Sequence, residues 1–274
     1  MIFANRGNER VKAEPDIKDA TCDICGNNLI PKCGSIKIWH WSHKKNKDCD
    51  DWSEPESEWH IKWKNEFPKE QQEVTVYRTV KKPVYSPYLQ GYEEKKVKHR
   101  ADIKLPSGKV IELQNSGISP DDIKDREHFY DNMLWLLNGM TLAQNIDIID
   151  RGGFISFRWK FPPKSWWHSE KPIYIDLSSK IESLKDILKQ IENGKKFGQS
   201  YSEEVSNDYG DGFHYENNSV DITEYIKNKS LRNLQLLENK PILFIKKIHH
   251  KIPCGGWGYL LSKEELLARL VNGN

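Results

Sequence analysis

Two apolar segments that each contain a carboxylate, joined by a short turn, constrain the fold of this chain most strongly. Residues 97–105 and 109–114 have the composition of strands, and Pro106-Ser107-Gly108 between them is a turn sequence. The pattern therefore predicts a β-hairpin. Residues two apart share one face of a strand, so Glu112 and Gln114 point the same way, and the short turn can bring Asp102 beside Glu112.

Two neighbouring carboxylates in such a hairpin need an explanation. Acids held close together repel each other and raise one pKa unless a cation neutralises them. Hard oxygen ligands suit Mg²⁺ or Mn²⁺, so Asp102 and Glu112 are a candidate site for either ion. The spacing alone leaves a second interpretation open, in which both acids face solvent and pair with nearby lysines.

Four of the five cysteines lie in the first fifty residues, which is typical of metal binding rather than of a disulfide framework. Cys22 and Cys25, followed by Gly26, have the spacing of a metal knuckle. We predict a structural Zn²⁺ site, with candidate ligands at Cys22, Cys25, His43 and Cys49. His40 in place of Cys49 is the alternative, and Cys33 is not needed. The isolated Cys254 is expected to be a buried packing residue.

The chain divides by composition into three parts: residues 1–51 with the zinc module, residues 52–160, and residues 161–274. In the middle part the patterns predict a helix over 54–67, a strand over 73–80, the hairpin, a helix from Ser119 to about Leu137, and strands over 145–149 and 154–160. In the last part they predict helices over 179–193 and from Ser262, a strand over 241–248, and a mobile segment over 201–218. The predicted class is α/β, with a mixed central sheet and an α+β C-terminal extension.

The overall charge does not identify a partner, because 42 Lys and Arg residues nearly balance 40 Asp and Glu residues. The best local basic surface is the run from Lys95 to Arg100, although such a run is also typical of a solvated strand edge. No apolar run approaches the ~20 residues that cross a bilayer, and the first thirty residues lack a signal-peptide core. We therefore expect a cytoplasmic protein without a membrane partner.

The motifs occur in an order that resembles a known family. The motifs are Cys22/Cys25, "HWSH" at 40–43, Cys49, "ESEWH" at 56–60, "RAD" at 100–102 and "ELQNS" at 112–116. In this order they resemble the competence-protein CoiA-like nuclease family of the PD-(D/E)xK superfamily, over about residues 20–160. The resemblance implies a restriction-endonuclease-like core. Residues beyond 160 resemble no family that we identify.

The resemblance also implies site roles. Asp102 and Glu112, with the backbone carbonyl of Leu113, would hold the Mg²⁺ or Mn²⁺ ion. Gln114 stands where the family pattern usually has lysine, and an amide supplies no positive charge. Lys64 is a candidate for that charge. Glu56, with Glu58 as a substitute, is the acid that the first helix would lend to the site.

Other candidate residues have two interpretations. His60 is a candidate proton carrier, while His60 and Lys64 would equally suit ordinary pairs on a helix surface. Arg126 and Tyr130, one helical turn apart, are more typical of packing than of phosphate contact. Lys95, Lys98 and Arg100 are the candidate DNA-binding residues.

The sequence thus predicts a metal-dependent deoxyribonuclease that acts in transformation, recombination or defence against foreign DNA. The rival prediction is a DNA-binding factor on a nuclease-like fold without catalysis, which Gln114 favours. A third is a protein whose residues 161–274 bind a second copy of the chain or another protein.

Overall fold

The chain forms two compact units: residues 1–138 with 163–174, and residues 139–162 with 175–272. The computed structural model describes residues 1–44, 49–86, 89–142, 145–161, 163–197, 204–205, 214–215, 221–249 and 254–272, with side chains omitted at 82–90, 142, 204–205, 214–215 and 272. Among these residues no helix has the length and apolar character needed to cross a bilayer.

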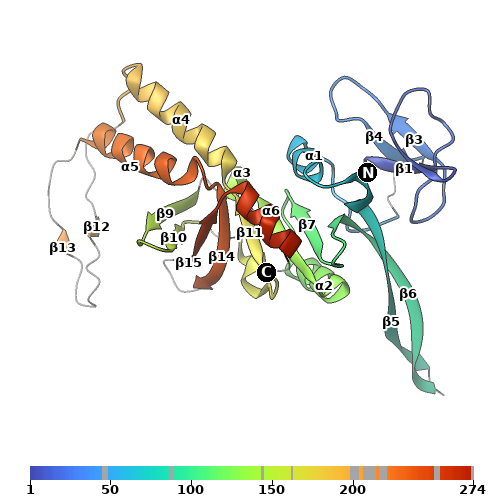
Figure 1. Cartoon of the computed structure of the whole chain (residues 1–274). Helices are drawn as coiled ribbons and strands as arrows, with labels where there is room; N and C mark the ends of the chain where they lie inside the picture. The colour runs from blue at the N-terminus through green and yellow to red at the C-terminus, as the bar shows by residue number, and fades with distance from the viewer. Residues whose placement is uncertain are drawn as a thin grey trace. The chain divides into compact units, whose positions relative to one another are not determined.

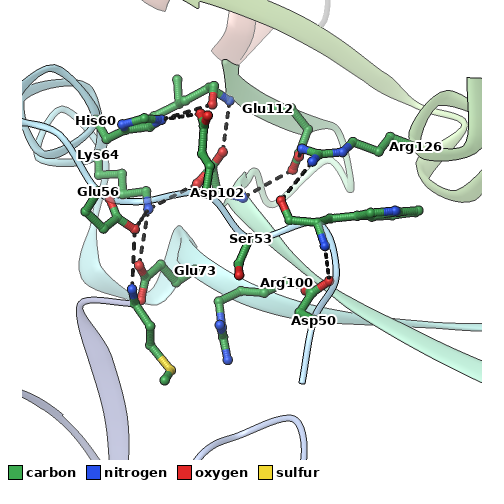
Figure 2. Close-up of a pocket in the computed structure, with 14 residues that line it drawn as sticks. Asp50, Ser53, Glu56, His60, Lys64, Glu73, Arg100, Asp102, Glu112 and Arg126 are labelled. Carbon is green, nitrogen blue, oxygen red and sulfur yellow. Dashed lines mark hydrogen bonds and ion pairs between the residues drawn. The ribbon is translucent and has the colours of Figure 1, made fainter. Parts of the chain in front are cut away.

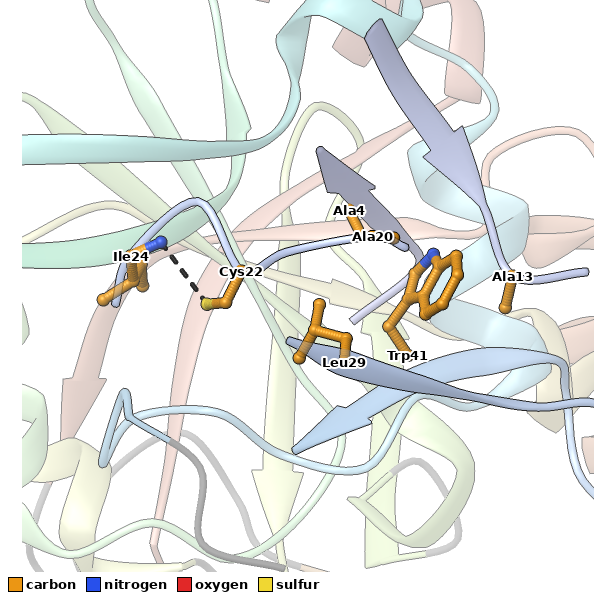
Figure 3. Close-up of a cluster of buried hydrophobic side chains, with 7 residues drawn as sticks. All are labelled: Ala4, Ala13, Ala20, Cys22, Ile24, Leu29 and Trp41. Carbon is orange, nitrogen blue, oxygen red and sulfur yellow. Dashed lines mark hydrogen bonds between the residues drawn. The ribbon is translucent and has the colours of Figure 1, made fainter. Parts of the chain in front are cut away.

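The first unit begins with two small hairpins around a compact apolar cluster. Strands β1 (Phe3–Arg6) and β2 (Glu9–Lys12) pair antiparallel, as do β3 (Leu29–Lys32) and β4 (His40–His43). Between them lie small buried residues and one large one, Trp41, which is 2% exposed. Figure 3 shows this cluster, formed by Ala4, Ala13, Ala20, Cys22, Ile24, Leu29 and Trp41. Such a core is small, so this segment needs a further source of stability.

A long antiparallel hairpin, β5 (Gln72–Ser86) with β6 (Leu89–Lys104), forms the edge of the main sheet of this unit. Its base joins β7 (Val110–Gln114) through only two residue pairs, Ile103 with Ile111 and Lys104 with Val110. Beyond the base, the hairpin extends away from the rest of its unit (Figure 1). The hairpin predicted over residues 97–114 is present as the β6–β7 pair, and its first strand, β6, begins earlier than predicted.

Helix α2 (Pro120–Tyr130) connects β7 to the parallel strand β8 (Met133–Asn138), in the manner of a β-α-β crossover. The prediction that this helix continues to about Leu137 is wrong. Asp131, with φ of 57°, ends the helix, and every residue of β8 is buried. A short run buried on all sides has no period that separates helix from strand.

The other elements of the first unit are short. Helix α1 (Glu58–Lys64) begins after the N-cap Ser57, four residues later than predicted, and stops before Phe67. The 3-10 helices η1 (Lys69–Gln71) and η3 (Lys164–His168) also lie in this unit, and strand β11 (Ile173–Asp176) begins in it and ends in the second unit. Because β8 follows α2, three strands rather than the predicted two follow the second helix up to residue 160.

The second unit has the strand order β14-β15-β10-β9, all antiparallel. The strands are β9 (Ile146–Asp150), β10 (Ile155–Trp159), β14 (Ile242–His249) and β15 (Gly255–Leu261). The helices are α3 (Gly139–Leu142), α4 (Ser178–Glu192), α5 (Ile222–Leu237) and α6 (Lys263–Asn272). The pair β12 (Glu204–Val205) and β13 (His214–Tyr215) falls in the segment predicted to be mobile, most of which lies outside the described residues. The chain as a whole is a mixed α/β protein.

Gly139, at the start of α3, should not accept a side chain. A Cβ atom there would lie 2.2 Å from the backbone oxygen of Asp176, whereas one at Gly117 would meet no atom within 4 Å. We expect Gly139→Ala to lower stability by about 2 kcal/mol, since overpacking against backbone cannot relax easily. Thermal melts of Gly139→Ala and Gly117→Ala test this, and equal melting temperatures would contradict it.

Candidate active site and metal centre

The four cysteine and histidine residues predicted to bind zinc lie together. The ligand atoms of Cys22, Cys25, His43 and Cys49 all lie within 4.8 Å of one another. The Cys22 and Cys49 sulfurs are 3.5 Å apart, and Cys25 Sγ is 3.3 Å from His43 Nε2. Ligands about 2.3 Å from a tetrahedral ion have similar separations, so the donor set fits Zn²⁺. His40 is not part of the group: its Nδ1 contacts the Ile38 carbonyl at 2.8 Å.

The cysteine-histidine segment also holds strand β6, and Figure 2 shows Asp50 of this segment near Arg100 of β6 in the acidic pocket. Asp23, inside the knuckle, accepts a 2.6 Å bond from Arg100 and another from Thr75. Asp50, directly after Cys49, accepts from the Arg100 backbone N–H at 2.7 Å and lies 2.8 Å from the His99 ring. These contacts lie two to three residues before Asp102, so the proposed zinc ligands and the candidate acidic site share one strand.

Asp102 and Glu112 lie side by side on β6 and β7, held by reciprocal bonds. The Leu113 N–H donates to Asp102 Oδ2 at 3.0 Å, and the Asp102 N–H donates to Glu112 Oε1 at 3.3 Å. Regular pairing of the strands ends at Ile103 and Ile111. Beyond these residues, therefore, the two carboxylates accept hydrogen bonds from backbone N–H groups that would otherwise pair with backbone carbonyls of the neighbouring strand.

Lys64 lies at the centre of the acidic cluster, with its side chain 2% exposed. Its Nζ is 2.7 Å from Glu56, 3.0 Å from Asp102 and 3.2 Å from Glu73. Burial lowers the pKa of Lys64, but these three carboxylates outweigh burial and hold the pKa well above its ordinary value. Lys64 is thus a permanent buried cation, and not the exposed helix pair that the sequence also allowed.

Glu112 lies on the other side of Asp102 and is 3% exposed. Arg126 Nη1 donates to Glu112 Oε2 at 3.1 Å and, through Nη2, to the Trp52 carbonyl at 2.8 Å. Burial and the neighbouring Asp102 nevertheless raise the pKa of Glu112 to about 8. One arginine therefore does not neutralise this pair of acids.

His60 forms the third part of the pocket. Its Nδ1 accepts from the Ser57 backbone N–H, so the proton is on Nε2, which faces Glu54 Oε1 at 2.9 Å and the Leu113 carbonyl at 3.2 Å. Burial lowers the pKa of His60, but the bond to Glu54 and the nearby acids raise it above the ordinary value. Glu54 also accepts from the Asn115 and Ser116 backbone N–H groups.

Several polar atoms around this pocket are buried without a hydrogen-bond partner: Gln114 Oε1, Glu56 Oε2, Arg126 Nε and the Tyr130 hydroxyl. Buried polar atoms normally have hydrogen-bond partners, so each of these four atoms can accept or donate a bond that no residue of the chain supplies. The Gln114 amide nitrogen, by contrast, is used by Glu54 and Ser116.

Acidic groups outnumber basic groups in the pocket. The acids Glu56, Glu73, Asp102 and Glu112 face Lys64, Arg126 and the Met1 amino group, which lies 3.8 Å from Glu56. The acids are in excess, and burial raises the pKa of Glu56 as well as that of Glu112. Within the described residues only the cysteine-histidine group brings its ligand atoms together as a metal site would, so a divalent ion in this pocket stays a prediction.

Some predicted residues lie outside the pocket. Glu58 and Lys95 are exposed, and Lys98 binds the Ile24 carbonyl, whereas Arg100 lines the pocket and is held by Asp23. Glu54 and Glu73 were not predicted. Glu54 has no periodic signal because it precedes the helix, and Glu73 enters the pocket through a positive φ of 47° that its sequence does not indicate.

Fold and site define a mixed α/β protein with a Cys₃His cluster beside a buried acidic pocket. Residues 8–51, which contain the Cys₃His cluster, match the family model "Competence protein CoiA, N-terminal domain". The chain is 31% identical over 108 residues, 38% of its length, to "Competence protein CoiA" of Bacillus subtilis (strain 168). That match spans 26% of the length of the relative. No solved structure matches the chain.

These matches confirm the resemblance to competence protein CoiA that the motifs of the chain indicate.

The first prediction from the site concerns the Cys₃His cluster. Cys25→Ser should reduce bound zinc, lower the melting temperature, and speed amide exchange at Arg100, whose N–H is held by Asp50 next to Cys49. Cys33→Ser, which changes a cysteine outside the cluster, is the control. Equal zinc content of the two variants, measured by elemental analysis, would rule out the assigned ligands.

The second prediction concerns pH in the absence of divalent ions. The pKa of Glu112 is raised in the folded state, so its contribution to stability is complete below about pH 4.5 and is lost as the pH rises towards 8. Glu112→Gln imitates the neutral acid. The melting temperature of the wild type should therefore fall relative to that of Glu112→Gln between pH 5 and 9. A constant difference over this range would contradict the raised pKa.

Proposed function

We propose that this protein is a metal-dependent deoxyribonuclease of the PD-(D/E)xK type. The observation that carries the proposal is the Asp102/Glu112 pair on adjacent strands, buried in a pocket with more acids than cations. The sequence α1, β5-β6-β7, α2, β8 supports a restriction-endonuclease-like core. The similarity to competence protein CoiA supports a role in DNA processing during transformation, while defence against foreign DNA is compatible with the same chemistry.

In this proposal Asp102, Glu112 and the Leu113 carbonyl hold Mg²⁺ or Mn²⁺. When bound, the ion supplies a Lewis acid for the scissile phosphate and lowers the pKa of an attacking water. The reciprocal backbone bonds of the two carboxylates fix their orientation before any ion enters. Arg126 restrains Glu112 from the opposite side.

The other pocket residues act on water and charge. Gln114 has its amide nitrogen occupied and its buried Oε1 without a partner, so that oxygen can accept from a water. Lys64 stays protonated and pairs with the Asp102 carboxylate at 3.0 Å. His60, with its proton on Nε2 and its pKa raised by Glu54, can donate a proton to a leaving oxygen.

Purified protein should nick supercoiled DNA with Mg²⁺ or Mn²⁺, and Asp102→Asn or Glu112→Gln should reduce the rate at least about 100-fold. A Lewis-acid contribution of several kcal/mol corresponds to such a loss. The conversion of supercoiled to relaxed plasmid measures it.

Asp125→Ala, which removes an exposed acid on α2, is the matched control and should leave the rate unchanged. Melting temperatures show whether each variant is folded. If both site variants cleave as fast as the wild type, the proposed site is wrong.

A second candidate function is a DNA-binding factor without catalysis. It is favoured by Gln114 in the lysine position and by the ion pairs that already hold both carboxylates, Lys64 with Asp102 and Arg126 with Glu112. Calorimetry separates the two functions: a nuclease site binds Mn²⁺ with a response that Asp102→Asn removes, and a non-catalytic site gives none.

A further inference from the structure

The distal part of the β5–β6 hairpin is built to be exposed on both faces. We call residues 77–81 and 92–97 the arm. Tyr77 is 61% exposed and Tyr92 is 75% exposed. Every other arm residue is exposed as well, apart from the half-buried Val80 and Val97. A two-stranded ribbon without a packed face is only marginally stable on its own. The β5–β6 pairing is much longer than the pairing of β6 with β7 at its base, so the length of the hairpin requires another explanation.

Each acidic residue of the arm has a lysine opposite it on the neighbouring strand, but two of its lysines have no acidic residue opposite them. The register pairs Glu94 with Lys81 and Glu93 with Lys82, so both acids of the arm have a lysine opposite them. Lys95 and Lys96 lie opposite Val80 and Thr79 and have no acid across the ribbon. Successive residues of a strand point to opposite faces, so these two lysines place uncompensated positive charge on both faces.

The dimensions of the hairpin that carries the arm match a nucleic-acid duplex. Its backbone from Tyr77, at the start of the arm, to Ser86, at the end of β5, spans about 30 Å at ~3.3 Å per residue, close to one turn of B-DNA. The major groove is about 12 Å wide and admits a two-stranded ribbon. Charge on both faces suits a ribbon that lies between the two phosphate chains of a groove, and the exposed tyrosines add contact area.

We propose that the arm binds duplex DNA and holds it next to the Asp102/Glu112 pocket at the base of the same hairpin. This rests on the proposed function, and it names the substrate as double-stranded. The DNA-binding residues of the arm differ from those predicted from the sequence. Lys98 and Arg100 contact the cysteine-histidine segment, so of the predicted residues only Lys95 remains. The arm adds Lys96 and the exposed Tyr77 and Tyr92.

The test compares Lys95→Ala/Lys96→Ala with Lys185→Ala/Lys189→Ala, a control pair of exposed lysines on α4. All chains also carry Asp102→Asn so that the DNA stays intact. Binding to a blunt 30-base-pair duplex and to a 30-nucleotide single strand is measured by fluorescence anisotropy at several salt concentrations.

Loss of two phosphate contacts should weaken duplex binding and reduce the slope of log affinity against log salt by about 2, while the control pair behaves like its parent. Tyr77→Ala should weaken duplex binding as well. Unchanged duplex affinity in the arm variant, or an equal loss for the single strand, would overturn the proposal.

Hydrolysis of bis(p-nitrophenyl) phosphate with Mn²⁺, in chains that retain Asp102, separates this proposal from the proposed function. The small diester does not reach the arm, so Lys95→Ala/Lys96→Ala should hydrolyse it at the wild-type rate. If the diester is cleaved but duplex affinity is unchanged, the arm proposal alone fails. If arm variants lose duplex affinity but the wild type never cleaves the diester, the nuclease proposal fails and the arm remains.

Discussion

The buried ammonium group of Lys64 is the interaction on which the acidic pocket depends. It joins Glu56 before α1, Glu73 at the start of β5 and Asp102 on β6, three segments that are separate in sequence. Removal of one partner from a buried ion pair leaves a desolvated charge, at a cost of about 3–5 kcal/mol. The position of α1 and the base of the hairpin are therefore coupled. Asp102 cannot move far from α1 while Lys64 remains charged.

The cysteine-histidine segment restrains the same strand from another direction. Its apolar core is small, and its contacts to β6 are polar and directional: Asp23 with Arg100, and Asp50 with the Arg100 amide. Polar contacts of this kind hold a strand only if their own backbone is rigid. A zinc ion on Cys22 and Cys49, residues next to Asp23 and Asp50, would supply that rigidity. The first fifty residues are thus better understood as part of the support of the pocket than as a separate module.

The sequence allowed the local features of the site to be predicted, but not their burial. The hairpin, the knuckle and the start of α2 at Ser119 follow from turn and cap residues, which act locally. His60 and Lys64 were equally compatible with a helix surface, and they are 1% and 2% exposed. Their burial is set by partners 9 to 53 residues away, Glu73 and Leu113. Strand β8 was missed because all of its residues are buried, so its sequence has no period that separates a strand from a helix.

The replacement of the usual lysine by Gln114 changes how charge reaches a phosphate. Lys64 is nearby, but three carboxylates already compensate its charge, so it offers little net positive potential to a substrate. The Arg126 guanidinium is likewise used by Glu112 and Trp52. Neither side chain can therefore stand in for the missing lysine as an isolated cation. The electrostatic stabilisation that hydrolysis needs would have to come from an ion held by Asp102 and Glu112, so the affinity of this pair for a divalent metal is the quantity that divides a nuclease from a DNA-binding protein.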